Sequence, residues 1–314
     1  MRDKKRSFLS YLFIFLLLVG CSSQPQPEPK PEKGSRDNTP VVLEPQASGE
    51  KIIGNSKITF DLSHSEDGYV MVKYTGDNPK VKVRIKHTQQ KDLYTYDMKD
   101  GYNIFPLTGG NGTYIFSAYE NISGTKYSQL FNKKENITIK NDYITYLYPN
   151  QYIDFNKNTK LINTAQDIAK PANNDLDVVS YVYEYVINNI TYDDDKASDA
   201  KNGEMAGYTP QVDEIMSKGT GICFDYAAVM ATMLRTQNIP TRMEIGYVNL
   251  SGESIYHAWI SVYIKDIGWV DDLIEFNGKE WSMMDPTLIS DSQNSSKIRN
   301  LIKEKTNYTT KYLY

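Results

Sequence analysis

Cysteine and histidine are scarce in this chain of 314 residues. It has two cysteines and three histidines, without the clusters of both that hold zinc. Basic residues are not in excess, since 35 Lys and Arg stand against 39 Asp and Glu. The resulting net charge of −4 argues against a nucleic-acid partner. No glycine-rich phosphate loop is present, and only the first 20 residues contain a long apolar run. We therefore expect no metal and no cofactor.

The first 21 residues have the layout of a bacterial export signal. Basic residues at positions 2–6 precede an apolar run over residues 8–19, which ends in Leu18-Val19-Gly20-Cys21. This ending resembles a lipobox, in which the cysteine receives lipid and becomes the mature N-terminus. The resemblance implies a signal peptide over residues 1–21 and a lipid anchor on Cys21. We expect the protein at the extracellular face of the bacterial cell membrane.

Cys223 is then left without a disulfide partner. A leftover thiol outside the cell indicates a reactive residue or an intermolecular link, although a small core residue is the alternative. From Cys223 onward, Ala227, Met230 and Met233 recur at helical spacing. The cysteine would therefore lie in the first turn of a helix. Unpaired N–H groups and the helix dipole favour a thiolate there.

A nucleophilic cysteine needs a base and a group that orients the base. His257 is the one histidine downstream of Cys223, in a segment whose alternation predicts a strand with one apolar face. Asp285 ends a second predicted strand, just before Pro286. The alternatives are a structural histidine and an aspartate that only begins a turn.

These segments together resemble the transglutaminase-like superfamily of papain-type cysteine enzymes. The resemblance is carried, in the family's order, by residues 221–227, 233–235, 239–242, 246–247, 257–259 and 285–287. It implies a triad in which Cys223 is the nucleophile, His257 is the base and Asp285 orients the imidazole.

Two parts of this site stay open at the level of sequence. Asp271 and Asp272 follow Gly268-Trp269 and are a second choice for the acid, although Asp285 fits the family pattern better. The Cys223 N–H is one expected oxyanion donor. Tyr208 or Gln211 is a candidate for the other, with a plain surface role as the alternative for both.

The chain divides into four expected regions of an α+β protein. A Pro-rich, disordered spacer over residues 22–50 follows the signal peptide. Short alternating strands over residues 51–145 predict an immunoglobulin-like β-sandwich, with His64 and His87 at its surface. The resemblance implies that residues 146–314 are a transglutaminase-like domain, with helices packed on an antiparallel sheet, and we expect a late strand near the end. Asn173 and Asn174 are the candidate caps of its strongest early helix.

Two functions follow from this organisation. The first is a cell-surface enzyme that transfers acyl groups from protein amides through Cys223, by transamidation or by peptide-bond hydrolysis. Its substrate would be a protein or peptide of the cell envelope or the extracellular space. The second is a surface binding module that keeps the fold without the chemistry. The β-sandwich is expected to act mainly as a spacer.

Overall fold

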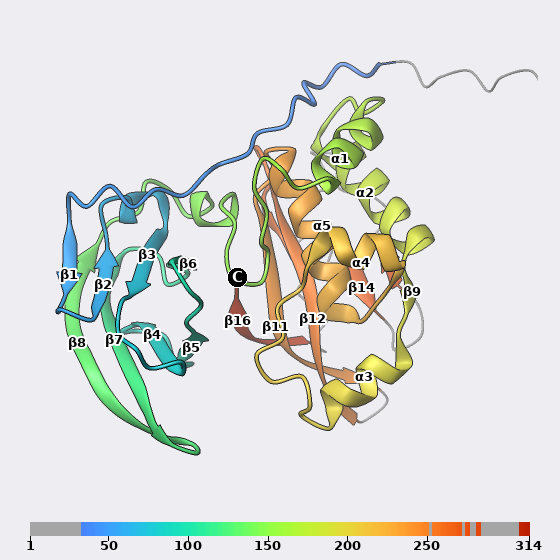
Figure 1. Ribbon diagram of the computed structural model, residues 1–314. Helices are drawn as coiled ribbons and strands as arrows, with labels where there is room; N and C mark the ends of the chain where they lie inside the picture. The colour runs from blue at the N-terminus through green and yellow to red at the C-terminus, as the bar shows by residue number, and fades with distance from the viewer. Residues whose placement is uncertain (1–32, 251–252, 272–273, 277–280, 284–307) are drawn as a thin grey trace, which may run out of the picture. The chain divides into compact units, whose positions relative to one another are not determined.

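The computed structural model describes residues 33–250, 253–271, 274–276, 281–283 and 308–314. Within these residues the chain is a mixed α/β protein (Figure 1). No helix among them is both long and apolar enough to span a bilayer. Cys21, Asp272 and Asp285 lie outside the described residues.

The first half of the chain forms two antiparallel sheets of four strands each. One sheet has the order β1-β2-β3-β6, and its strands are β1 (Ile52–Gly54), β2 (Ile58–Asp61), β3 (Tyr69–Tyr74) and β6 (Tyr102–Pro106). The other has the order β5-β4-β7-β8, with β4 (Val81–His87), β5 (Tyr94–Asp97), β7 (Gly112–Ser123) and β8 (Lys126–Ile137). Short 3-10 turns occur at Ser65–Asp67 and Ile144–Tyr146.

Alternating side chains bury one face of each strand in a shared core. In β4, Val81, Val83 and Ile85 are buried while Lys82 and Arg84 between them are partly exposed, as the period of two requires. Phe60 of β2 meets Phe116 of β7 edge to face, with ring centroids 5.8 Å apart, so the two sheets pack on each other. The surface position expected for His87 is wrong, because its ring is buried against Tyr114.

Five helices follow the two sheets in the part of the chain that the structure describes. They are α1 (Leu161–Ala169), α2 (Asp175–Asn189), α3 (Asp194–Lys201), α4 (Val212–Lys218) and α5 (Cys223–Thr236). Asn174 caps α2 by accepting a hydrogen bond from the Asp177 N–H at 3.0 Å, which confirms it as the cap. A two-residue ladder joins β9 (Thr191–Tyr192) to β10 (Thr220–Gly221) and places the start of α5.

A third four-stranded sheet packs against α5. The sheet has the order β13-β12-β11-β16, from β11 (Thr241–Leu250), β12 (Glu253–Ile264), β13 (Gly268–Val270) and β16 (Tyr308–Leu313). Ala258, Ile260 and Val262 of β12 are buried, and both β11 and β12 pack on α5 (Figure 1). A small hairpin pairs β14 (Ile274–Phe276) with β15 (Trp281–Met283). The late strand expected from the sequence is β16.

Residues 33–50 differ from the disordered spacer expected there. They have no regular secondary structure, but they are bonded to the helical part of the chain. Arg36 Nε lies 2.7 Å from the Asp175 carboxylate, and its Nη2 donates to the Gln237 carbonyl at 2.6 Å. Buried Asn38 donates to the Ala169 carbonyl at 2.7 Å. Composition predicts the lack of a core in such a segment but not these specific polar contacts.

Candidate functional site

Cys223 is the first residue of α5, as the sequence predicts. Ile222 before it is extended, and β10 ends at Gly221, so the chain turns directly from a strand into the helix. The thiol is a free cysteine and its residue is only partly buried. A side chain at this position faces the unpaired N–H groups of the helix start.

The thiolate expected at Cys223 is wrong for this site. The backbone N–H groups of Ala258, Phe224 and Cys223 itself hydrogen-bond the sulfur and lower the pKa of the thiol. Burial outweighs them and raises this pKa to about 11, and the nearby Asp225 carboxylate raises it further. Cys223 is therefore a neutral thiol at neutral pH. The Ala258 contact also places the sulfur against β12, next to His257.

His257 lies on β12, opposite Gly246 of β11. The side chain is buried, and its ring lies nearly parallel to that of Trp259, with centroids 6.3 Å apart. Burial lowers the pKa of His257 to about 4, so the imidazole is neutral at neutral pH. A neutral imidazole can accept the proton of a neutral thiol.

Of the three candidate acids for orienting His257, Asp271 alone lies within the described residues. Asp285, the preferred acid, and Asp272 lie outside them. Asp271 follows β13, is exposed, and has its Oδ1 3.8 Å from Nη1 of Arg242. The choice of Asp285 stays a prediction.

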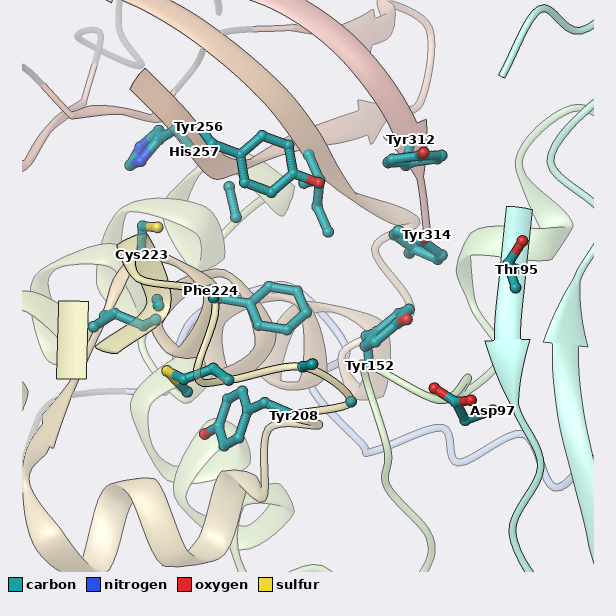
Figure 2. A pocket seen from close by; sticks show the side chains of 18 of the residues that line it. Thr95, Asp97, Tyr152, Tyr208, Cys223, Phe224, Tyr256, His257, Tyr312 and Tyr314 are labelled. Carbon is teal, nitrogen blue, oxygen red and sulfur yellow. The ribbon is translucent and has the colours of Figure 1, made fainter. Parts of the chain in front are cut away.

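Cys223 and His257 line one cavity of about 600 Å³ (Figure 2). Several tyrosines and Phe224 belong to its walls. The ring centroid of Phe224 lies 5.5 Å from that of Tyr152 and 6.3 Å from that of Tyr208. Thr95 and Asp97 of β5 also belong to the lining. Among the described lining residues Asp97 alone is charged at neutral pH, and Lys82 pairs with it at 2.9 Å. The cavity therefore suits an uncharged group.

Of the two side chains expected as oxyanion donors, only Tyr208 lines the cavity of Cys223. Tyr208 lines the cavity of Cys223, but its hydroxyl donates to Asp225 Oδ1 at 2.5 Å. Gln211 lines a second hollow, which Tyr208, Lys196 and Glu214 also line. The oxyanion role of each stays a prediction, while the N–H groups of Cys223 and Phe224 already face the sulfur.

Sequence reasoning missed a buried acid two residues after the cysteine. Asp225 is fully buried in the first turn of α5, and its Oδ2 accepts from the Ile222 N–H at 2.8 Å and from Lys196 Nζ at 2.6 Å. An acidic residue at the third helical position is a known capping signal, and here it stands in an otherwise apolar run. Lys196 gave no such signal, because it lies in a polar, acid-rich segment. Within the described part of the chain no group of His, Cys, Asp and Glu could hold a metal ion.

Comparison with known proteins agrees with this reading of the fold. The family model of the transglutaminase-like superfamily matches residues 162–271. UPF0252 protein MJ1282 of Methanocaldococcus jannaschii is 25% identical over 236 residues, which cover 69% of this chain. The match spans 65% of that relative, slightly less than two thirds of its length.

Solved structures that align with this chain include a proposed cysteine protease and a transglutaminase. A proposed cysteine protease from Cytophaga hutchinsonii aligns over 70% of this chain and 78% of its own, with 15% identity and a TM-score of 0.33. Red sea bream transglutaminase aligns over 71% of this chain and 48% of its own, with 13% identity and a TM-score of 0.25.

Proposed function

We propose that this chain, whose residues 162–271 form a transglutaminase-like domain, is a thiol acyl-transfer enzyme acting on protein amides. One observation carries the proposal. The Cys223 sulfur sits at a helix N-terminus, against the Ala258 N–H, in the same cavity as the neutral imidazole of His257. This arrangement supplies a nucleophile, a base and N–H donors at one point.

The reaction begins with proton transfer from the Cys223 thiol to His257. The sulfur bonds to the carbonyl carbon of an amide, and the N–H groups at the start of α5 stabilise the oxyanion. The C–N bond then breaks, and the nitrogen takes the proton from the imidazolium and leaves. It leaves as ammonia from a glutamine side chain, or as an amine from a peptide bond. Water or a lysine amine attacks the thioester, which releases the thiol.

The cavity favours a neutral acyl group flanked by aromatic or aliphatic side chains. Tyr152, Phe224 and Tyr256 offer rings with few charges around them, and the charge of Asp97 is offset by Lys82. An acidic side chain next to the reacting amide would lose its hydration without gaining a cationic partner. We therefore propose peptides with uncharged neighbours as substrates.

The remaining sequence-based expectations belong to the same proposal. We propose that Asp285 orients His257, that the paired sheets of residues 52–137 are an immunoglobulin-like sandwich, and that lipid on Cys21 holds the protein at the cell surface. The substrate would then be a protein of the cell envelope or the extracellular space.

The alternative is a binding module without catalysis, and one observation favours it. Burial raises the pKa of Cys223 and lowers that of His257, which leaves both groups neutral and unreactive at rest. In this case the aromatic cavity would bind a peptide without changing it.

Labelling of a substrate protein separates the two functions. The full chain is incubated with a glutamine-rich protein and a labelled primary amine, and the products are analysed by mass spectrometry for both label and cleavage. We expect one of the two products with the natural chain and neither with Cys223→Ala or His257→Gln. Product formation that survives Cys223→Ala, or its absence with the natural chain over a broad panel of proteins, would contradict the enzyme.

A further inference from the structure

One side of the cavity is formed by a segment with little packing of its own. Residues 203–208, here named the pocket wall, supply the lining residues Gly203, Met205, Ala206, Gly207 and Tyr208. All of the wall is exposed except Met205 and Tyr208, which are partly buried. Helix α3, which leads into it, has no buried residue. Apolar burial therefore contributes little to the position of this segment.

Polar contacts to one buried carboxylate take its place. Asp225 Oδ1 accepts from the Tyr208 hydroxyl of the wall at 2.5 Å, and Oδ2 accepts from Lys196 Nζ of α3 at 2.6 Å. Lys196 Nζ also lies 2.8 Å from the Tyr208 oxygen and 4.2 Å from the centroid of its ring. The three side chains all contact one another, and the positive charge of Lys196 balances the negative charge of Asp225.

The same carboxylate holds the turn that carries the nucleophile. Asp225 Oδ2 accepts from the Ile222 N–H, the residue directly before Cys223. Gly221 leaves room for it, since a Cβ there would lie 2.8 Å from the Asp225 Cβ and 3.0 Å from Oδ2. The wall and the thiol are thus located by bonds to a single side chain.

We propose that Lys196, Asp225 and Tyr208 are positioning residues that hold the pocket wall against the first turn of α5 and so decide how large a group reaches Cys223. The proposal rests on the proposed function for its biological meaning, because the same cavity would receive the acyl donor. None of the three side chains needs to touch the reacting atoms. They act by setting the fraction of molecules in which the pocket wall has moved away from α5, and this fraction determines how often the entrance to Cys223 is wide.

The test measures access to Cys223 with two reagents of different size. The full chain is treated with iodoacetamide, which is small, and with a maleimide that carries a pyrene ring. Modification of the peptide that contains Cys223 is followed by mass spectrometry, so that reaction at Cys21 does not count. This readout does not require enzymatic turnover, so an inactive protein would refute the proposed function and leave this test intact.

Three variants and a control complete the design. Tyr208→Phe removes one hydroxyl and keeps the ring, Lys196→Met removes the charge, and Lys196→Met with Asp225→Asn removes both charges together. Lys201→Met changes an exposed lysine of the same helix. We expect the rate with the pyrene reagent, divided by the rate with iodoacetamide, to rise at least about five-fold in the first three and to stay unchanged in the control.

Several results would overturn the proposal. One is an unchanged ratio in Tyr208→Phe and in the charge-free double variant, with melting temperatures near that of the natural chain. Another is an equal rise in both rates, which would indicate general loosening instead of a moved wall. If Lys196→Met alone fails to fold because it strands a buried carboxylate, the other two variants decide the question.

Discussion

Helix α5 carries a buried charge at each end, and the two are held in different ways. Near its start, fully buried Asp225 is bonded to side chains of α3 and of the pocket wall. Near its end, equally buried Arg235 donates to backbone carbonyls of Thr241, Tyr148 and Tyr314. Both charges suit the helix dipole, with the acid at the N-terminus and the base at the C-terminus.

This difference in partners indicates that Arg235 has a structural role, whereas Asp225 positions the site. The carbonyls around Arg235 belong to strand ends and a connection that also pack elsewhere, so Arg235 fastens parts that are already in place. The partners of Asp225 come from a segment that buries almost nothing. We therefore expect changes at the Arg235 end to alter stability, and changes at the Asp225 end to alter the site.

The largest expected effect is the pH dependence of thiol reactivity at the start of α5. Since only the thiolate reacts, a pKa of about 11 for Cys223 predicts an alkylation rate that rises about a thousand-fold from pH 7 to pH 10. Rates with iodoacetamide across this range test it. Asp225→Asn removes a charge that raises this pKa, so its profile should shift to lower pH. A rate that is flat from pH 6 upward would instead indicate a thiolate paired with an imidazolium.

Replacement of the charge at the other end should mainly cost stability. Arg235→Met removes the guanidinium donor from the carbonyls of Thr241, Tyr148 and Tyr314, of which only that of Tyr314 keeps a second donor, the Met243 N–H, among the described contacts. We expect a loss of about 3–5 kcal/mol in the free energy of unfolding. Urea unfolding followed by circular dichroism measures it. The ratio of the two alkylation rates should not change in this variant. A loss below about 1 kcal/mol would remove the contrast between the two ends.

His257 should make the stability sensitive to acid. Its pKa is about 4 in the folded chain and near 6.5 when unfolded, so only the unfolded state takes up this proton between those values. Stability contributed by His257 is present above pH 6.5 and is lost as the pH falls to 4, by about 3 kcal/mol in total. Unfolding of the natural chain and of His257→Gln at several pH values gives the difference. Parallel pH curves for the two would show that the histidine is not buried as a neutral group.

A substitution at Gly221 tests the same contact between Asp225 and the turn before Cys223 without changing Asp225 itself. In Gly221→Ala the new methyl would crowd Asp225, and we expect a loss of about 1–3 kcal/mol together with easier access of the pyrene reagent. Thr220→Ala, at the exposed neighbour, serves as the control. If the ratio of the two alkylation rates in Gly221→Ala equals that of the natural chain, then displacing the Asp225 carboxylate does not displace the pocket wall.

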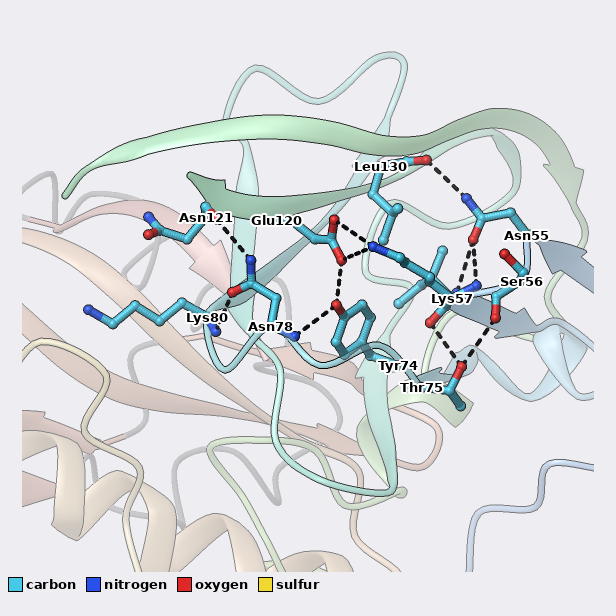
Figure 3. A network of polar contacts seen from close by, with 11 residues as sticks. Asn55, Ser56, Lys57, Tyr74, Thr75, Asn78, Lys80, Glu120, Asn121 and Leu130 are labelled. Carbon is cyan, nitrogen blue, oxygen red and sulfur yellow. Dashed lines mark hydrogen bonds and ion pairs between the residues drawn. The ribbon is translucent and has the colours of Figure 1, made fainter. Parts of the chain in front are cut away.

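A polar network in the first half of the chain provides the small-effect reference (Figure 3). There Lys57 Nζ lies 3.0 Å from Glu120 Oε1, and the Tyr74 hydroxyl donates to the same carboxylate. Lys57 is half exposed, and such pairs contribute little. We expect Glu120→Gln to change the free energy of unfolding by no more than about 0.5 kcal/mol, as measured in urea. A loss as large as that of Arg235→Met would show that burial is not the reason for the large effect expected at Arg235.

The sequence predicts local elements of the site better than their electrostatic state. Spacing of apolar residues locates the start of α5 at Cys223, and alternation locates the strand of His257. The protonation states depend on how deeply both side chains are covered once α5 and β12 pack together. How deeply a side chain is buried depends on tertiary packing and does not follow from its position in a helix. For this reason the sequence predicted a thiolate, whereas burial in the folded chain keeps Cys223 a neutral thiol.

Contacts between distant segments are the other part that the sequence does not reveal. Lys196 and Asp225 are 29 positions apart, and Arg36 reaches Gln237 across 201. Polar side chains have many possible hydrogen-bond partners, and local sequence patterns do not choose among them. Apolar cores are more predictable, because any apolar side chain of suitable size at the right spacing along a strand can fill them. The two sheets in the first half of the chain are an example.

The near-parallel rings of His257 and Trp259 give the site an optical signal of its own. An excited indole loses energy readily to a positively charged imidazole beside it, and hardly at all to a neutral one. Light emission from Trp259 should therefore dim when His257 takes up a proton, whether from acid or from the thiol of Cys223. Trp269 stays next to the permanent positive charge of Arg242, 3.5 Å from its ring, and provides a constant background. The first chemical step could thus be followed by fluorescence in the unmodified protein.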